Sequence, residues 1–218
     1  MAINFNAILN FLCNISNPCQ DQYQYTLNNG KLKKVNPPVD INYNTTNYST
    51  NNLFNNPIIL VILESPHKDE FNGNNPIGPA QGKTGIFFFS YFANAIGQSA
   101  KLNGIYNSSS VYDIVLMNSD QYQCSNGATL NGNYLNKKQR DINWKANFSI
   151  NNIDFINRIK AINPTIIINL CTNGISKPTL RNRVETAIFN NILQNTNIHY
   201  TSGNHPSSWW LKKNIVIN

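Results

Sequence analysis

Three short polar segments hold the residues of this chain that are best suited to chemistry, and each follows an apolar run. They read Glu64-Ser-Pro-His67, Asn118-Ser-Asp120 and Gly203-Asn-His-Pro-Ser-Ser208. A carboxylate such as Glu64 can stabilise a developing positive charge and orient a water molecule, and a histidine such as His205 can donate a hydrogen bond to a departing anion. These residue types therefore predict acid–base or electrostatic catalysis, provided that the fold brings the segments together.

The apolar runs before these segments predict strands, and amphipathic segments between them predict helices. Short runs rich in β-branched residues are typical of strands buried on both faces. Strands that alternate with helices predict an α/β domain with three layers, α/β/α, and a central, mainly parallel four-stranded sheet. Ligands bind beyond the carboxyl ends of such strands, which is where the polar segments lie. The expected strands are 57–63, 111–117, 165–170 and 197–201, and the expected helices are 84–98, 153–162 and 181–194.

Residues 1–56 differ in composition from the rest of the chain. Residues 3–12 have the spacing of a short helix, and Asn, Tyr, Thr, Pro and Gln dominate from there to Asn56. We therefore expect an N-terminal helix and an irregular extension over 1–56, followed by one α/β domain over 57–218. A chain of 218 residues is long enough for one sizeable domain of this kind.

The charge balance points to a polyanionic partner. The formal net charge is +7, an excess that favours nucleic acid, although a merely basic surface is the alternative explanation. No run approaches the roughly 20 apolar residues that a membrane span needs, so no membrane is expected. The N-terminus shows no charged leader before an apolar stretch, which predicts a cytoplasmic protein.

The four cysteines give only a weak signal for a metal site. Cys13, Cys19, Cys124 and Cys171 form no CxxC pair, so we expect reduced thiols, with Cys171 in the core. The segment Gly78-Pro-Ala-Gln-Gly82-Lys83-Thr84 is one residue short of the GxxxxGK[ST] phosphate-binding loop and does not directly follow its strand. Neither feature predicts a metal or a nucleotide triphosphate as cofactor.

Several segments occur in the order found in a known enzyme family. Leu63-Glu-Ser-Pro-His-Lys-Asp-Glu70 with Pro76-Ile-Gly-Pro-Ala-Gln-Gly82 resembles G-E-x-P-G…D-E…P-F-x-G-x-x-G, the first motif of iron–sulfur-type uracil-DNA glycosylases. Asn163-Pro-Thr-Ile-Ile-Ile-Asn-Leu170 is similar to their third-strand segment, and Asn204-His-Pro-Ser207 to their closing H-P-S motif. Over residues 57–210 the chain resembles a divergent member of the uracil-DNA glycosylase superfamily.

The chain also departs from that family. Leu63 replaces the leading glycine, and Ser65 stands where the best-known uracil enzymes carry a catalytic Asp. The paired cysteines that hold the iron–sulfur cluster are missing, so no cofactor is implied. The substrate therefore does not follow directly from the resemblance.

The resemblance implies a glycosylase that flips a base out of double-stranded DNA and hydrolyses its N-glycosidic bond. Glu64 occupies the position of the acid beneath the sugar, with Asp69 or Glu70 in reserve, and His205 would donate to the carbonyl oxygen of the departing base. No lysine is placed for a Schiff base, so a monofunctional enzyme that leaves an abasic site is implied. A loop cap for Glu64 and a turn histidine for His205 are the structural alternatives.

Further DNA contacts follow from the same resemblance. Phe88 aligns with the phenylalanine that stacks on the flipped base, and Trp209 with the apolar side chain inserted into the gap, a core tryptophan being the alternative. Hydroxyl and lysine side chains near the motifs are expected to contact phosphates without reading sequence. These are Ser65, Lys68, Lys83, Ser207, Ser208, Lys212 and Lys213.

The expected base reader is the main difference from the family. Its members use an Asn on the second strand to pair with uracil, and the alignment places Asp113 there. An ionised carboxylate only accepts hydrogen bonds, so it favours the N4 amine of cytosine. His67 replaces the tyrosine that blocks C5, which suggests a modified cytosine such as glucosylated hydroxymethylcytosine of phage DNA, and hence antiviral defence. If the register is shifted, Asn118 is the next candidate.

Three other functions stay open at this point. Uracil removal in base-excision repair is the nearest, and a non-catalytic DNA-binding protein with the same fold is the second. An enzyme acting on free nucleosides is the third, and the positive charge disfavours it.

Overall fold

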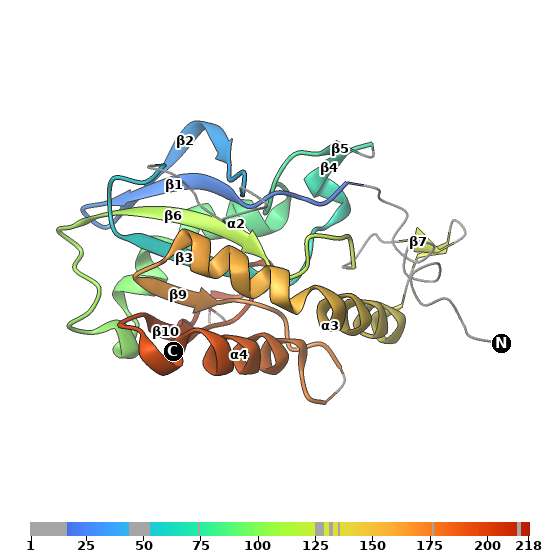
Figure 1. Cartoon of the computed structure of the whole chain (residues 1–218). Helices are drawn as coiled ribbons and strands as arrows, with labels where there is room; N and C mark the ends of the chain where they lie inside the picture. The colour runs from blue at the N-terminus through green and yellow to red at the C-terminus, as the bar shows by residue number, and fades with distance from the viewer. Residues whose placement is uncertain are drawn as a thin grey trace.

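A six-stranded sheet forms the centre of the computed structural model (Figure 1). The structure describes residues 17–43, 53–73, 75–124, 129–130, 133–134, 136–175, 177–212 and 215–218. The strand order is β10-β9-β3-β6-β1-β2, and β3, β6, β9 and β10 run parallel to one another. The strands are β1 (Gln22–Asn28), β2 (Lys31–Asp40), β3 (Ile58–Leu63), β6 (Val111–Asn118), β9 (Ile166–Asn169) and β10 (His199–Ser202).

The predicted parallel strands are confirmed, and so are the three helical regions, with one change of length. The helices are α2 (Lys83–Gly97), α3 (Lys137–Ile162) and α4 (Leu180–Asn191). α3 begins 16 residues before the predicted start at residue 153. Its start is set by a capping box in which Asn136 and Gln139 satisfy each other's backbone N–H groups. The short elements are η1 (Lys68–Glu70), β4 (Phe71–Asn72), β5 (Asn75–Pro76), η2 (Ala100–Leu102), β7 (Thr129–Leu130), β8 (Asn133–Tyr134), η3 (Leu193–Asn195) and η4 (Pro206–Ser208).

The prediction of an irregular N-terminal extension is wrong for residues 22–40. β1 and β2 form a hairpin that adds two antiparallel strands to the sheet next to β6. The turn is Asn29-Gly30, both with positive φ (48° and 66°), which is the Asn-Gly signature of a tight hairpin. These residues therefore belong to the same sheet as the later strands. The expected helix over 3–12 lies outside the described residues, as does Cys13.

Helices cover both faces of the sheet and give the three layers seen in Figure 1. α3 and α4 bury Trp144, Phe155 and Ile188 against one face, and α2 buries Phe88 and Phe92 against the other. Cys171 is buried in the first of these layers, as predicted. Among the described residues no helix is long and apolar enough to cross a membrane.

Candidate active site

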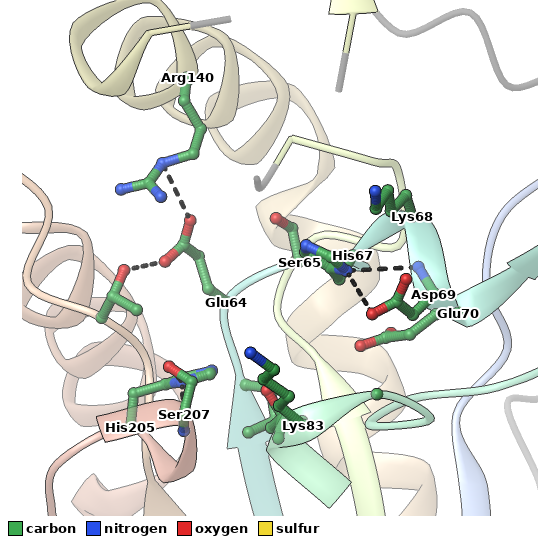
Figure 2. Close-up of a pocket in the computed structure, with 14 residues that line it drawn as sticks. Glu64, Ser65, His67, Lys68, Asp69, Glu70, Lys83, Arg140, His205 and Ser207 are labelled. Atoms are coloured by element: carbon green, nitrogen blue, oxygen red, sulfur yellow. Dashed lines mark hydrogen bonds and ion pairs between the residues drawn. The ribbon is translucent and has the colours of Figure 1, made fainter. Parts of the chain in front are cut away.

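A pocket of about 590 Å³ opens at the carboxyl ends of β3 and β9 (Figure 2). The chain leaves β3 toward α2 on one face of the sheet and leaves β9 toward α4 on the opposite face, so the two loops diverge. Such a reversal leaves a crevice in which α/β proteins bind ligands. The pocket is lined by the segment 63–70, by the first turn of α2, and by Arg140, Thr172, His205 and Ser207.

Glu64 lies at the base of this pocket. Its side chain is 4% exposed. Thr172 donates a hydrogen bond to Oε2, and Arg140 Nε lies 3.9 Å from Oε1. Burial raises the pKa of Glu64 from 4.5 to about 7, Arg140 opposes that rise, and the charges of Asp141 and Asp120 add to it. The carboxyl group therefore changes protonation near neutral pH, as expected of an acid–base or electrostatic catalyst.

The backbone of Glu64 is held as firmly as its side chain. Its carbonyl oxygen accepts hydrogen bonds from Ser119 Oγ (2.6 Å), Trp144 Nε1 (3.1 Å) and Asp120 N (3.1 Å). These donors come from the loop after β6 and from α3, so two neighbouring elements fix where the carboxylate points.

His205 faces the same pocket from the loop after β10. The Ser207 N–H donates to Nδ1 (3.2 Å), so Nδ1 carries no proton and the neutral ring has its proton on Nε2. Burial, and after it the charges of Arg181 and Arg140, lowers the pKa of His205 to about 4. The ring is therefore neutral at pH 7 and offers an Nε2–H donor. This is the donor that the sequence predicted for a departing base.

A second buried carboxyl group lines the pocket on the side of β6. Glu70 is 4% exposed, and Asn118 Nδ2 donates to its Oε2 (3.1 Å). Burial raises the pKa of Glu70 to about 8, while the hydrogen bond from Asn118 acts to lower it. His67 and Asp69 lie nearer the opening, where His67 Nδ1 is 3.2 Å from Asp69 Oδ2. Asn118 thus stands directly behind Glu70, at the end of β6.

Four of the seven expected phosphate contacts line the pocket. Ser65, Lys68, Lys83 and Ser207 do so, and Ser65 Oγ has no hydrogen-bond partner among the described residues. Ser208 does not line it and instead donates to the His205 carbonyl (2.8 Å). Lys212 is exposed after η4, and Lys213 lies outside the described residues. Within the described ranges, no three His, Cys, Asp or Glu side chains are placed to hold a metal ion.

The structure contradicts Asp113 as a pocket residue. Asp113 pairs in register with Ile58 at the amino end of β3, whereas Glu64 follows the carboxyl end of that strand. Its carboxylate accepts hydrogen bonds from Tyr23 Oη (2.8 Å), Asn56 Nδ2 (3.0 Å) and the backbone N–H groups of Asn55 and Asn56. Asp113 therefore ties the chain before β3 to the hairpin and has a structural role. The prediction failed because it aligned the wrong end of the strand.

Asp113→Asn should accordingly destabilise the fold without changing any base preference. The substitution weakens a buried, charge-assisted hydrogen-bond set, so we expect a loss of about 2–3 kcal/mol in the free energy of unfolding, measured by urea denaturation. Asp40→Asn is the matched control, since Asp40 is exposed and accepts a bond from Gln22. A changed preference among bases at unchanged stability would contradict this assignment.

Phe88 and Trp209 are also core residues, contrary to their predicted roles. Phe88 is 1% exposed and stacks on Phe92 with ring centroids 4.3 Å apart. Trp209 is fully buried, packs on Phe88 and donates from Nε1 to the Asn204 carbonyl (2.9 Å). Phe88 lies on the apolar face of α2, and Trp209 follows η4 in a loop that packs against that helix, so both side chains are buried. Trp210 is the tryptophan that faces outward, with 63% of its surface exposed.

Two residues that contact Glu64 were missed from the sequence. Arg140 comes from the first turn of α3, which the helical pattern did not extend far enough to include. Thr172 follows β9 in a polar segment that no motif marks. The capping sequence Asn136-x-x-Gln139 was the available signal for the helix start. Comparison of the sequence with protein-family models and with curated proteins gave no match.

Proposed function

We propose that this protein is a DNA glycosylase of the uracil-DNA glycosylase type. It would bind a nucleotide flipped out of DNA and hydrolyse the bond between base and deoxyribose. The observation that carries the proposal is the meeting of Glu64 and His205 in one pocket, although 141 positions separate them in the chain. Buried acid and neutral imidazole are the two groups that such a reaction needs on opposite sides of the breaking bond.

The reaction develops positive charge on the sugar and negative charge on the base. Ionised Glu64 would lie beneath the sugar, stabilise the cation and orient the water that attacks C1′. His205 Nε2–H would donate to the carbonyl oxygen of the base as the bonding pair moves onto it. The water supplies the hydroxyl group at C1′ and a proton for the departing base, so the products are an abasic site and the free base.

The charges around the opening support DNA as the partner. Lys68 and Lys83 line the pocket, and the chain has a net charge of +7. Phosphate contacts of this kind position a strand without reading its sequence, and binding should weaken steeply with salt. Free nucleosides offer nothing for these lysines to bind.

The position of Asp113 removes the argument for a cytosine-type base. Asn118, the next candidate, is fully buried behind Glu70, donates a hydrogen bond from Nδ2 to that carboxyl group and does not line the pocket. Neither β6 residue therefore supports a particular base. We propose a uracil-type base on the resemblance to the family alone, and a role in phage defence is left without residue support.

The test is incubation with duplexes that carry uracil, cytosine, 5-hydroxymethylcytosine or glucosylated 5-hydroxymethylcytosine, followed by alkaline cleavage of abasic sites. Cleavage of the uracil duplex is expected, and Glu64→Gln should abolish most of it. Cleavage of a cytosine derivative alone would refute a uracil-type base. Binding of DNA with no product from any duplex would refute the enzyme and support the non-catalytic alternative.

Trp210 is the candidate for filling the gap that a flipped base leaves. It is exposed and lies three residues after Ser207, which lines the pocket. Trp210→Ala should weaken binding to substrate duplex roughly tenfold and binding to single strands much less, because only the duplex has a stacking gap. Trp209→Ala is the paired variant and should cost about 3–5 kcal/mol of stability. Equal losses on both DNA forms in a titration would exclude Trp210 from this role.

A further inference from the structure

The start of α3 approaches one oxygen of Glu64 directly and acts on the other through the segment after β9. On one side, Arg140 Nε lies 3.9 Å from Glu64 Oε1, and the Arg140 side chain is 12% exposed. On the other side, Asp141 Oδ2 accepts a hydrogen bond from the Ile175 N–H (2.6 Å). That bond fixes the segment after β9 in which Thr172 donates to Glu64 Oε2. Figure 2 shows Glu64 with Arg140 on one side and His205 on the other.

We propose that Arg140 is a positioning residue of this site, whose guanidinium favours the ionised form of Glu64 and helps to orient it for the reaction. Asp141, the next residue, holds the segment that carries Thr172 to the same carboxylate. The inference rests on the proposed function, because it assigns a part in that reaction. The inference extends the proposed site to Arg140 and Asp141, which neither the motifs nor the resemblance includes.

The packing against Asp141 is close enough to make this connection rigid. A Cβ atom at Gly174 would lie 2.5 Å from Asp141 Oδ2, so only glycine permits this approach, and its φ is +67°. Arg140 Nη2 lies 3.6 Å from Asp141 Oδ1. Arg140, beside Glu64, and Asp141, which holds the segment of Thr172, are therefore neighbours on α3. We expect the contacts of Arg140 and Thr172 with Glu64 to change together.

The two carboxyl groups that act on Glu64 oppose its ionisation, whereas Lys68 and Lys83 are cations that line the same pocket. Asp141 on α3 and Asp120 in the loop after β6 both raise the pKa of Glu64, and burial raises the pKa of Asp120 itself to about 7. The Cys171 thiol, after β9, interacts with Glu64 but carries no charge near neutral pH, since burial raises its pKa. Arg140 forms an ion pair with Glu64, and among the described residues it is the cation that favours the charged carboxylate.

Removing this cation should move the pH dependence of the reaction. Ionised Glu64 is the reactive form, so kcat/KM should rise with pH around a midpoint near 7. An opposite charge at this distance changes a pKa by roughly one to three pH units, so Arg140→Met should move the midpoint to about 8 or above. The rate at pH 7 should fall about fivefold or more and rise again as pH passes the new midpoint, and Arg140→Lys should keep the original midpoint to within about half a unit.

Arg183→Met is the matched control. Arg183 lies on α4 and lines a separate groove between α3 and α4, so its loss should leave the pH profile of kcat/KM unchanged. If Arg140→Met does not fold, Arg140→Gln replaces it, since it also removes the charge. A uniform loss of rate at every pH, with the midpoint unmoved, would overturn the proposal.

A second measurement does not depend on glycosylase activity. The stability of the protein is compared with that of Glu64→Gln at pH 5 and pH 9, in the wild-type and in the Arg140→Met background. The gain from Glu64→Gln at pH 9 should be larger when Arg140 is absent, because the buried carboxylate then has no cation beside it. Equal gains would overturn the coupling. A larger gain in a protein that cleaves no duplex would support the coupling and refute only the proposed reaction.

Discussion

Glu64→Gln should lower the rate of base release at least about 10²-fold, the scale on which a positioned acid–base or electrostatic group contributes. Glutamine matches the shape of the side chain and can still accept the hydrogen bond from Thr172. It cannot become an anion beneath the sugar. The loss should therefore appear in single-turnover rates on saturating duplex, while DNA affinity changes little.

The same substitution should make the protein more stable at pH 8. Burial raises the pKa of Glu64 from 4.5 to about 7, so between these values the folded state keeps a proton that the unfolded state has lost. Stability therefore falls as pH rises through this window. Glu64→Gln should recover up to about 3 kcal/mol at pH 8 and almost nothing at pH 4, where both states are protonated.

Thermal melts at the two pH values check this sign, and Glu185→Gln on α4 is the control. A gain of about 3 kcal/mol corresponds to a rise of roughly 6–12 °C in Tm for a chain of this size. If Glu64→Gln lowered the stability at pH 8 while the wild-type protein was active, the ionised carboxylate would not be the destabilising group that we expect at an active site. Unchanged rates would show that Glu64 is not the acid of the reaction.

His205→Ala should also lower the single-turnover rate by about 10²-fold, because it removes a donor aimed at the departing base. The Ser207 N–H holds Nδ1, so the donor is Nε2–H. Its pKa of about 4 keeps the ring neutral, and no second titration near pH 6 should appear in the rate profile. The loss should be as large at pH 6 as at pH 9.

His199→Ala is the matched control for this variant. His199 begins β10 at the opposite end of the strand, is exposed, and should tolerate the change in both rate and stability. His205→Asn offers a shorter donor and should retain part of the activity that His205→Ala loses. Equal activity of His205→Ala and wild type would exclude the imidazole from the reaction and leave it as a turn residue.

The segment order in the sequence was enough for the parallel sheet and for the two principal site residues. Apolar, β-branched runs favour buried strands whatever their neighbours in the sequence, so local composition was enough to predict β3, β6 and β9. Parallel strands place their carboxyl ends at one edge, and this made Glu64 and His205 neighbours before any contact was known. The Asn29-Gly30 turn carried an equally local signal for the hairpin, which the polar composition of residues 1–56 obscured.

Tertiary structure alone decided which side chains point into the pocket. Asp113 pairs with Ile58 at the amino end of β3 and Asn118 with Leu63 at the carboxyl end, and neither side chain lines the pocket, because Glu70 lies between Asn118 and the cavity. Trp209 and Trp210 are adjacent and chemically identical, so only the packing on Phe88 determines which one is buried. Arg140 lies 76 positions after Glu64, and no local pattern encodes a contact that two separate elements create on folding.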